Sequence, residues 1–173
     1  MSNNNLLNSN LNKHVYKTLF VSLVNENKWE TLIEMFTHGV LDINIKDERG
    51  RNCLYWAIKK NKIEIIKVLI KLNINTKEVS SNLSAINYAV CQDNVKVLKC
   101  LKNCGLDINE VDNVNSTPLI YAVLYNKINS TNYFIQNGSN IHHEDFLGNS
   151  PFNIAHNLKI TYLINKFEEN SSL

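Results

Sequence analysis

Residues 112–143 read DNVNSTPLIYAVLYNKINSTNYFIQNGSNIHH, a stretch that predicts two short helices joined by a tight turn. Thr117 is suited to cap the first helix, and Pro118 suits its first position, where a missing N–H costs nothing. Ala122 falls on the apolar face of this helix, and its small side chain lets a neighbouring helix approach closely. Gly138 offers the left-handed residue that commonly ends a second helix.

The same pattern occurs four times along the chain. Alanines recur 32 or 33 residues apart, each three positions after a large apolar residue. The four pairs are Leu54 with Ala57, Ile86 with Ala89, Leu119 with Ala122, and Phe152 with Ala155. One helix pair cannot bury its own apolar face, so neighbouring pairs are expected to stack against it.

The motif Thr117-Pro118-Leu119 followed by Ala122, and its recurrence, resemble the ankyrin-repeat family. The resemblance implies an all-α solenoid of about five stacked helix-turn-helix repeats with short turn fingers, the outer two being degenerate caps. We expect a disordered leader at 1–12, a single ankyrin-repeat domain at 13–167 and a polar tail at 168–173.

Composition favours a folded chain of modest charge. Hydrophobic residues make up 44% of the 173 residues, and the net charge is +2. So small a charge does not favour nucleic-acid or membrane binding. The sequence has no long apolar run and no secretory signal at its start. We expect a monomer when free, located in the cytoplasm, or in the cytosol of a host cell if it is a delivered effector.

No catalytic or metal-binding motif is found in the sequence. Phosphate-binding glycine loops, the paired histidines of zinc proteases and the elbow of serine hydrolases are all missing. We expect no enzyme activity, no cofactor and no metal. The four cysteines read as small buried thiols. An enzyme or metal protein that uses His142, His143, His156 and these cysteines is the competing class.

The resemblance also implies a binding face made of the turn tips and the exposed side of the first helices. Its N-terminal part is basic and its C-terminal part apolar and aromatic. The candidate partner-binding residues are Lys46, Glu48, Arg49, Arg51, Lys59, Lys60, Leu83, Gln92, Val114, Leu124, Tyr125, Phe146 and Leu147.

Two structural alternatives accompany this face. The apolar tips could instead fold back onto their own repeats, which would bury Phe146 and Leu147. Trp56, Tyr88 and Tyr121 share one register position, and we expect them in the core between repeats.

The resemblance therefore implies a non-enzymatic module that captures a partner protein in a concave face. We expect a stand-alone inhibitor of the immunity or decoy type, whose partner offers an acidic and an apolar surface. The alternative is a scaffold or adaptor in a host-directed or signalling complex. A nucleic-acid binder that uses the basic residues is less favoured, because interleaved aromatic residues for base stacking are missing there.

Overall fold

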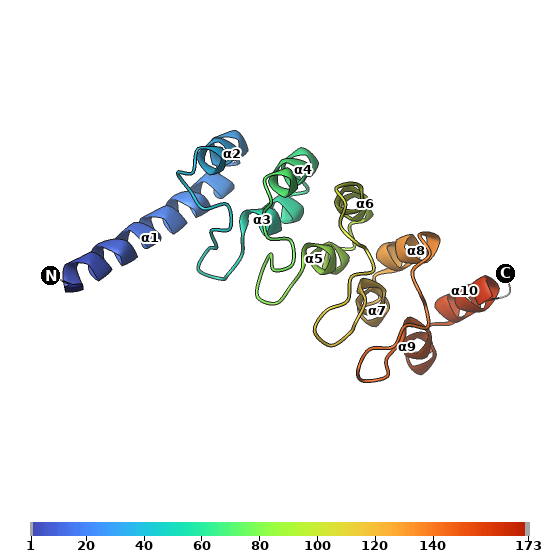
Figure 1. Cartoon of the computed structure of the whole chain (residues 1–173). Helices are drawn as coiled ribbons and strands as arrows, with labels where there is room; N and C mark the ends of the chain where they lie inside the picture. Colours follow the sequence, from blue (N-terminus) through green and yellow to red (C-terminus); the bar gives the residue numbers. More distant parts are fainter. Residues whose placement is uncertain (1, 172–173) are drawn as a thin grey trace. The chain divides into compact units, whose positions relative to one another are not determined.

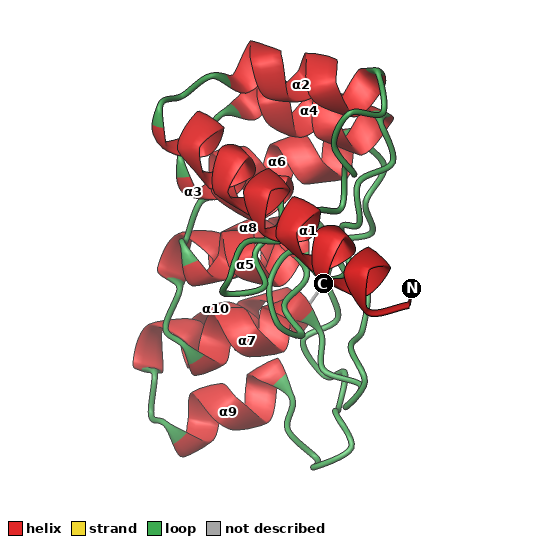
Figure 2. Ribbon diagram, turned by 90° about the vertical axis from the view of Figure 1, so that its left-hand side faces the viewer, coloured by secondary structure: helices red, strands yellow, loops and turns green. Residues whose placement is uncertain are grey.

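The computed structural model describes residues 2–171, with side chains for residues 14–169. This part of the chain forms ten α-helices, arranged in five consecutive pairs, and has no strand beyond an isolated bridge between Ser80 and Leu83 (Figure 2). The expected all-α fold of five helix pairs is confirmed. The chain divides into two compact units, Met1–Ala85 (unit 1) and Ile86–Leu173 (unit 2).

Unit 1 contains two helix pairs. α1 (Ser2–Asn25) packs on α2 (Trp29–Thr37), α3 (Cys53–Lys59) packs on α4 (Ile63–Lys71), and α2 also contacts α4 (Figure 1). Each large aliphatic or aromatic side chain that is fully buried contributes about 1.5–3 kcal/mol to stability. In unit 1 the largest of these side chains belong to Phe20, Leu32, Leu54, Ile58, Ile66 and Leu69.

Unit 2 contains the remaining three pairs. α7 (Pro118–Leu124), the first helix of the central pair, packs against α8 (Ile128–Gln136) in its own pair and against α9 (Pro151–Asn157) in the next pair. The largest buried side chains belong to Leu98, Leu101, Leu119, Ile120, Phe134 and Phe167. The helices are α5 (Ala85–Cys91, starting at the unit boundary), α6 (Val95–Asn103), α7 (Pro118–Leu124), α8 (Ile128–Gln136), α9 (Pro151–Asn157) and α10 (Thr161–Ser171).

The first helices begin as the sequence predicts. Thr117 Oγ1 accepts the N–H of Ile120 at 3.3 Å, and Pro118 occupies the first turn of α7. Side-chain oxygens of Asn52 and Ser150 cap α3 and α9 in the same way. Such a cap is worth about 1 kcal/mol. The four recurrent alanines are all fully buried: Ala57, Ala89, Ala122 and Ala155.

Left-handed residues close the turns of every repeat. The tight turn between the two helices of each pair contains one non-glycine residue with φ between 49° and 58°. These residues are Asn27, Asn61, Asp93, Asn126 and Lys159. The longer finger turns use Gly50 and Gly148 in two places and Asn82 and Asn115 in two others, all with positive φ. Asparagine tolerates this conformation better than most residues because its short polar side chain bonds locally.

The element boundaries differ from the predicted domain limits at both ends. α1 begins at Ser2, inside the predicted leader 1–12, and α10 continues to Ser171, inside the predicted tail 168–173. Residues 1, 172 and 173 lie outside the described residues, so the division into leader, domain and tail stays a prediction. Between residues 2 and 171, no helix combines the length and the apolar character that crossing a membrane requires.

Candidate protein-binding surfaces

The turn from Asp47 to Arg51, the second finger, is held rigidly in unit 1. The buried carboxylate of Asp47 accepts the backbone N–H of Arg49 at 2.9 Å and that of Arg51 at 3.0 Å. Gly50 supplies the positive φ of 73° that this tight turn requires. The tip residues between these bonds therefore have a fixed direction.

Four side chains beside this finger form what we call the cation–aromatic cluster: Arg51, Tyr55, Trp56 and Lys59. The Arg51 guanidinium carbon lies 4.3 Å from the Trp56 ring centroid, and Lys59 Nζ lies 5.2 Å from it. Arg51 Nε donates to Asp47 Oδ2 at 2.7 Å, and Trp56 Nε1 donates to the same oxygen at 3.2 Å. The Tyr55 and Trp56 rings pack edge to face, with their centroids 5.5 Å apart. Trp56 is half-buried rather than enclosed in the core, so the prediction for it is wrong.

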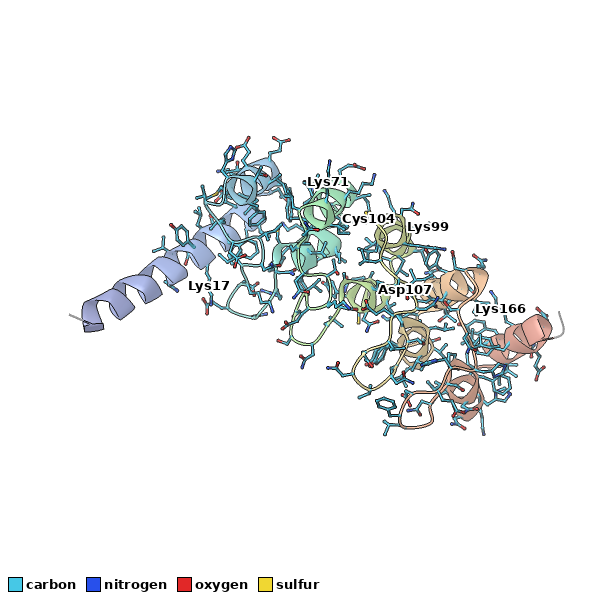
Figure 3. All side chains as sticks on the ribbon, viewed as in Figure 1. Lys17, Lys71, Lys99, Cys104, Asp107 and Lys166 are labelled. Carbon is cyan, nitrogen blue, oxygen red and sulfur yellow. The ribbon has the colours of Figure 1, made fainter. Side chains whose placement is uncertain are left out.

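The charged candidates next to the cluster differ in how they are paired. Lys46 Nζ lies 2.9 Å from Glu78 Oε1, and Glu48 Oε1 lies 3.6 Å from Lys17 Nζ, a residue of α1 (Figure 3). Surface pairs of this kind contribute at most about 1 kcal/mol, so a partner can displace them.

Arg49 and Lys59 are exposed, whereas Lys60 Nζ donates to Asn27 Oδ1 at 3.3 Å. Leu83 belongs to the third finger, the turn from Val79 to Leu83. It is half-buried, and its carbonyl accepts the N–H of Val79 at 2.8 Å. It therefore projects less than the sequence suggested.

In unit 2, the fourth finger starts at Asp112 and uses the same bonding scheme. The Asp112 carboxylate accepts the N–H groups of Val114 and Ser116, each at 3.0 Å, and the Tyr121 hydroxyl donates to it at 2.5 Å. Burial and this hydrogen bond raise the pKa of Tyr121 to about 12. The Tyr125 ring stacks on Tyr121 with centroids 6.0 Å apart, which orients an exposed aromatic side chain.

The fifth finger, which starts at Asp145, is bonded most extensively. The Asp145 carboxylate accepts the N–H groups of Leu147 and Asn149, each at 2.9 Å, and the Ser116 hydroxyl at 3.0 Å. Burial raises the pKa of Asp145, but the hydrogen bonds from Asn149, Leu147 and Ser116 together bring it below its ordinary value.

Two large apolar side chains extend from this rigid tip. Phe146 is 76% exposed and Leu147 is 81% exposed. The Phe146 N–H donates to the Val114 carbonyl at 3.0 Å, which joins the fourth and fifth fingers. The alternative in which the tips fold back onto their own repeats is wrong for these two residues.

The candidate residues divide between the two units of the chain. In unit 1 the set is Lys46, Glu48, Arg49, Arg51, Lys59, Lys60 and Leu83; in unit 2 it is Gln92, Val114, Leu124, Tyr125, Phe146 and Leu147. That both sets share one concave face stays a prediction. Sequence reasoning missed the role of the finger aspartates, although their recurrence at 47, 112 and 145 in the repeat register was a signal.

Unit 2 also contains a polar pocket of about 340 Å³ between α6 and α8. Asp93 lines it, but its carboxylate already accepts the N–H and hydroxyl of Ser130, each at 2.7 Å, and the Asn129 amide at 2.8 Å. Burial raises the pKa of Asp93, but these hydrogen bonds outweigh that effect and bring the pKa below its ordinary value. With the Asn129 backbone N–H at 3.3 Å, the carboxylate accepts four hydrogen bonds within the protein, about as many as its two oxygens can accept.

The histidines and cysteines of the competing class are not gathered into a centre. His142 and His156 flank the Phe152 ring at 5.0 and 4.2 Å, and burial raises the pKa of Cys53 to about 12. Within residues 2–171, no three His, Cys, Asp or Glu side chains are placed to hold a metal ion.

Comparison with known proteins gives a consistent result. A family model described as ankyrin repeats (three copies) matches residues 4–112 and 73–145. An ankyrin repeat protein of Acanthamoeba polyphaga mimivirus is 27% identical over 76% of this chain and 17% of its own length. An ankyrin repeat protein of fowlpox virus (strain NVSL) is 29% identical over 56% of this chain and 16% of its own length.

A third relative, from vaccinia virus (strain Western Reserve), is named interferon antagonist and is 27% identical over 52% of this chain and 31% of its own length. The chain thus spans less than a third of each of these three relatives. Because the two matched segments together cover residues 4–145, the chain belongs to the ankyrin-repeat family, whose stacked repeats bind proteins and are typically not enzymatic.

Proposed function

We propose that this chain inhibits a partner protein by capturing it, and that it acts alone rather than as an adaptor. The observation that carries the proposal is the fifth finger, where Phe146 and Leu147 are 76% and 81% exposed on a hydrogen-bonded tip. Exposed apolar groups on a rigid support are the usual anchors of protein interfaces. The viral relative named interferon antagonist supports an inhibitory role.

The two sets of candidate residues would make different contributions. Exposed charges such as Arg49 and Lys59 set the rate and orientation of encounter, and each pair is worth about 0.2–1 kcal/mol. A desolvated aromatic anchor such as Phe146 or Tyr125 costs about 2 kcal/mol or more when truncated. The partner would therefore offer an acidic region and an apolar pocket. We place this encounter in the cytosol.

Surface plasmon resonance on six variants tests this division once the partner is purified. Tyr125→Ala and Phe146→Ala are expected to accelerate dissociation about thirtyfold or more. Arg49→Ala and Lys59→Ala are expected to slow association, an effect that disappears at high salt.

The matched controls are Glu64→Ala and Lys67→Ala, which alter an exposed pair on α4 whose Nζ–Oε1 distance is 2.8 Å. If these controls weaken binding while the aromatic variants do not, the assignment of the surface fails.

Inhibitor and adaptor differ in what happens to the partner. An inhibitor abolishes the activity of its partner at a ratio of one to one, and a variant with Phe146→Ser and Leu147→Ser does not. An adaptor leaves that activity intact and recovers a second protein in a ternary complex. Titrating the wild-type chain into a partner activity assay, followed by mass spectrometry of the complex, separates the two.

A further inference from the structure

We propose that the cation–aromatic cluster of unit 1 is a carboxylate-binding site for an acidic peptide segment of the partner. The inference rests on the proposed protein-binding function and specifies the chemistry of one contact. It adds Tyr55 and Trp56 to the binding surface.

Arg51 is already ordered by its contacts within unit 1. Its Nε–H is bonded to Asp47 at 2.7 Å and its guanidinium lies 4.3 Å from the centroid of the Trp56 ring. The bond to Asp47 uses one of five N–H donors. The Arg51 side chain retains 18% exposure, so a ligand can still reach it. A carboxylate that binds such a fixed fork avoids most of the entropy cost of ordering a mobile arginine.

The charges around the second finger are not balanced. The Asp47 carboxylate accepts four hydrogen bonds, three from its own finger and one from Trp56. Its one negative charge is therefore already engaged by these groups. Arg49 and Lys59 form no ion pair among the described residues, and Lys60 bonds only the neutral Asn27 amide there. The cations around this finger therefore outnumber the anions that face them.

Arg51 and Lys59, the two cations of the cluster, also repel each other. Arg51 and Lys59 both lie within 5.2 Å of the Trp56 centroid, so their charged centres are less than about 10 Å apart. Like charges at that separation repel, and an anionic ligand between them relieves the repulsion. Unit 1 as a whole has twelve Lys and Arg against eight Asp and Glu, a net +4, whereas unit 2 has six against eight, a net −2.

The cluster is better suited to a peptide than to a nucleic acid. Proteins that bind single strands stack the bases on open aromatic rings. The Trp56 ring is instead approached by Arg51 and Lys59, which occupy the space that a base would need. The carboxylate of an Asp or Glu side chain can instead accept hydrogen bonds from the N–H edge of the Arg51 guanidinium and from the Lys59 ammonium. It does not need an open ring face.

The fluorescence of Trp56 can report on the site once the other tryptophan of the chain is replaced. The other, Trp29, is 6% exposed, and its Nε1–H has no acceptor within the described part of the chain. Trp29→Phe removes that unsatisfied donor and leaves Trp56 as the single fluorophore. The full chain with this change is titrated with hexaglutamate, and hexalysine serves as the charge control.

We expect a saturable change in Trp56 emission with hexaglutamate that weakens with salt, and none with hexalysine. Lys59→Gln and Arg49→Gln should each weaken the affinity about two- to fivefold. The matched control is Lys71→Gln, an exposed lysine on the side of α4 away from the finger loop (Figure 3), which should leave the affinity unchanged.

Three results overturn the inference: no emission change at millimolar hexaglutamate, an equal loss with Lys71→Gln, or tighter binding of a single-stranded oligonucleotide of the same charge. If Trp29→Phe does not fold, the indole N–H signals of the wild-type chain in a ¹H–¹⁵N spectrum provide the same readout. A wild-type chain that captures its partner but ignores hexaglutamate refutes this site and leaves protein binding standing.

Discussion

Three aspartates, Asp47, Asp112 and Asp145, hold finger tips by the same pair of bonds, to the N–H groups two and four residues later. Each bond to a charged acceptor contributes about 1.5–3 kcal/mol. The side chains between these bonds vary from charged to apolar without changing the turn. The finger therefore separates stability, supplied by the aspartate, from recognition, supplied by the residues that follow it.

The lowered pKa of Asp145 leads to a pH-dependent prediction. Because the folded-state pKa lies below the ordinary value of 3.8, the ionised carboxylate stabilises the fold above about pH 4. That contribution is lost as the pH falls through the folded-state pKa. Asp145→Asn should therefore lower the free energy of unfolding by about 1–3 kcal/mol at pH 7 and by less near pH 3.

Urea denaturation at both pH values measures this difference. Glu144→Gln, a change at the exposed neighbouring residue, is the control and should have little effect at either pH. An Asp145→Asn deficit that is equally large at pH 3 would show that ionisation of this carboxylate does not stabilise the finger.

At the scale of the helix, α7 is packed closely by two neighbouring helices. It packs against α8 and α9, and Ala122 at its centre is fully buried. Ala122→Leu adds three carbons where neighbouring helices are close, so we expect a loss of about 1–3 kcal/mol in the free energy of unfolding. Leu124→Ala on the exposed side of the same helix should change it by about 0.5 kcal/mol or less.

Guanidinium denaturation of both variants tests the prediction. A midpoint for Ala122→Leu that matches the wild type would mean that the helices around α7 have space to separate, and the packing argument would fail.

Local signals predicted the elements well but not every side chain in them. Thr117 and Ala122 act as the sequence indicates, because a cap and a small contact residue depend on spacing along one helix. Trp56, Tyr88 and Tyr121 share a register position, yet only Tyr88 is buried. The difference follows from the residue nine positions earlier, which is an aspartate for Trp56 and Tyr121 and a valine for Tyr88.

The aspartate accepts the indole N–H of Trp56 or the hydroxyl of Tyr121 and so holds that side chain at the finger. Periodicity cannot reveal this pairing, since it depends on distances across a turn. The exposure of Phe146 and Leu147 was expected from the register, whereas the bonds that make their tip rigid were not.

At the scale of the whole chain, each unit is stabilised by contacts between successive helix pairs. In unit 2, α9 covers one side of α7, and α10 packs on α9. Deleting residues 145–173 should expose that apolar side, lower the thermal midpoint and cause aggregation. Differential scanning fluorimetry and light scattering measure both effects.

The full-length chain with Phe146→Ser and Leu147→Ser is the control for this truncation. It loses the exposed apolar side chains of the fifth finger but keeps α9 and α10, so its midpoint should stay within a few degrees of the wild type. A truncated chain that remains as stable and as dispersed as this control would mean that α9 and α10 do not stabilise unit 2.

The left-handed turn residues connect this backbone to the gene that encodes it. All five glycines of the chain have positive φ, and among residues 2–171 eight further positions with positive φ are filled by asparagine six times, aspartate once and lysine once. Glycine codons begin with two guanines, whereas asparagine codons begin with two adenines. A gene can therefore become rich in adenine and thymine and still encode these turns, because asparagine also adopts the left-handed conformation at a low energetic cost. Nucleotide composition and fold are thereby uncoupled at the positions where the chain reverses.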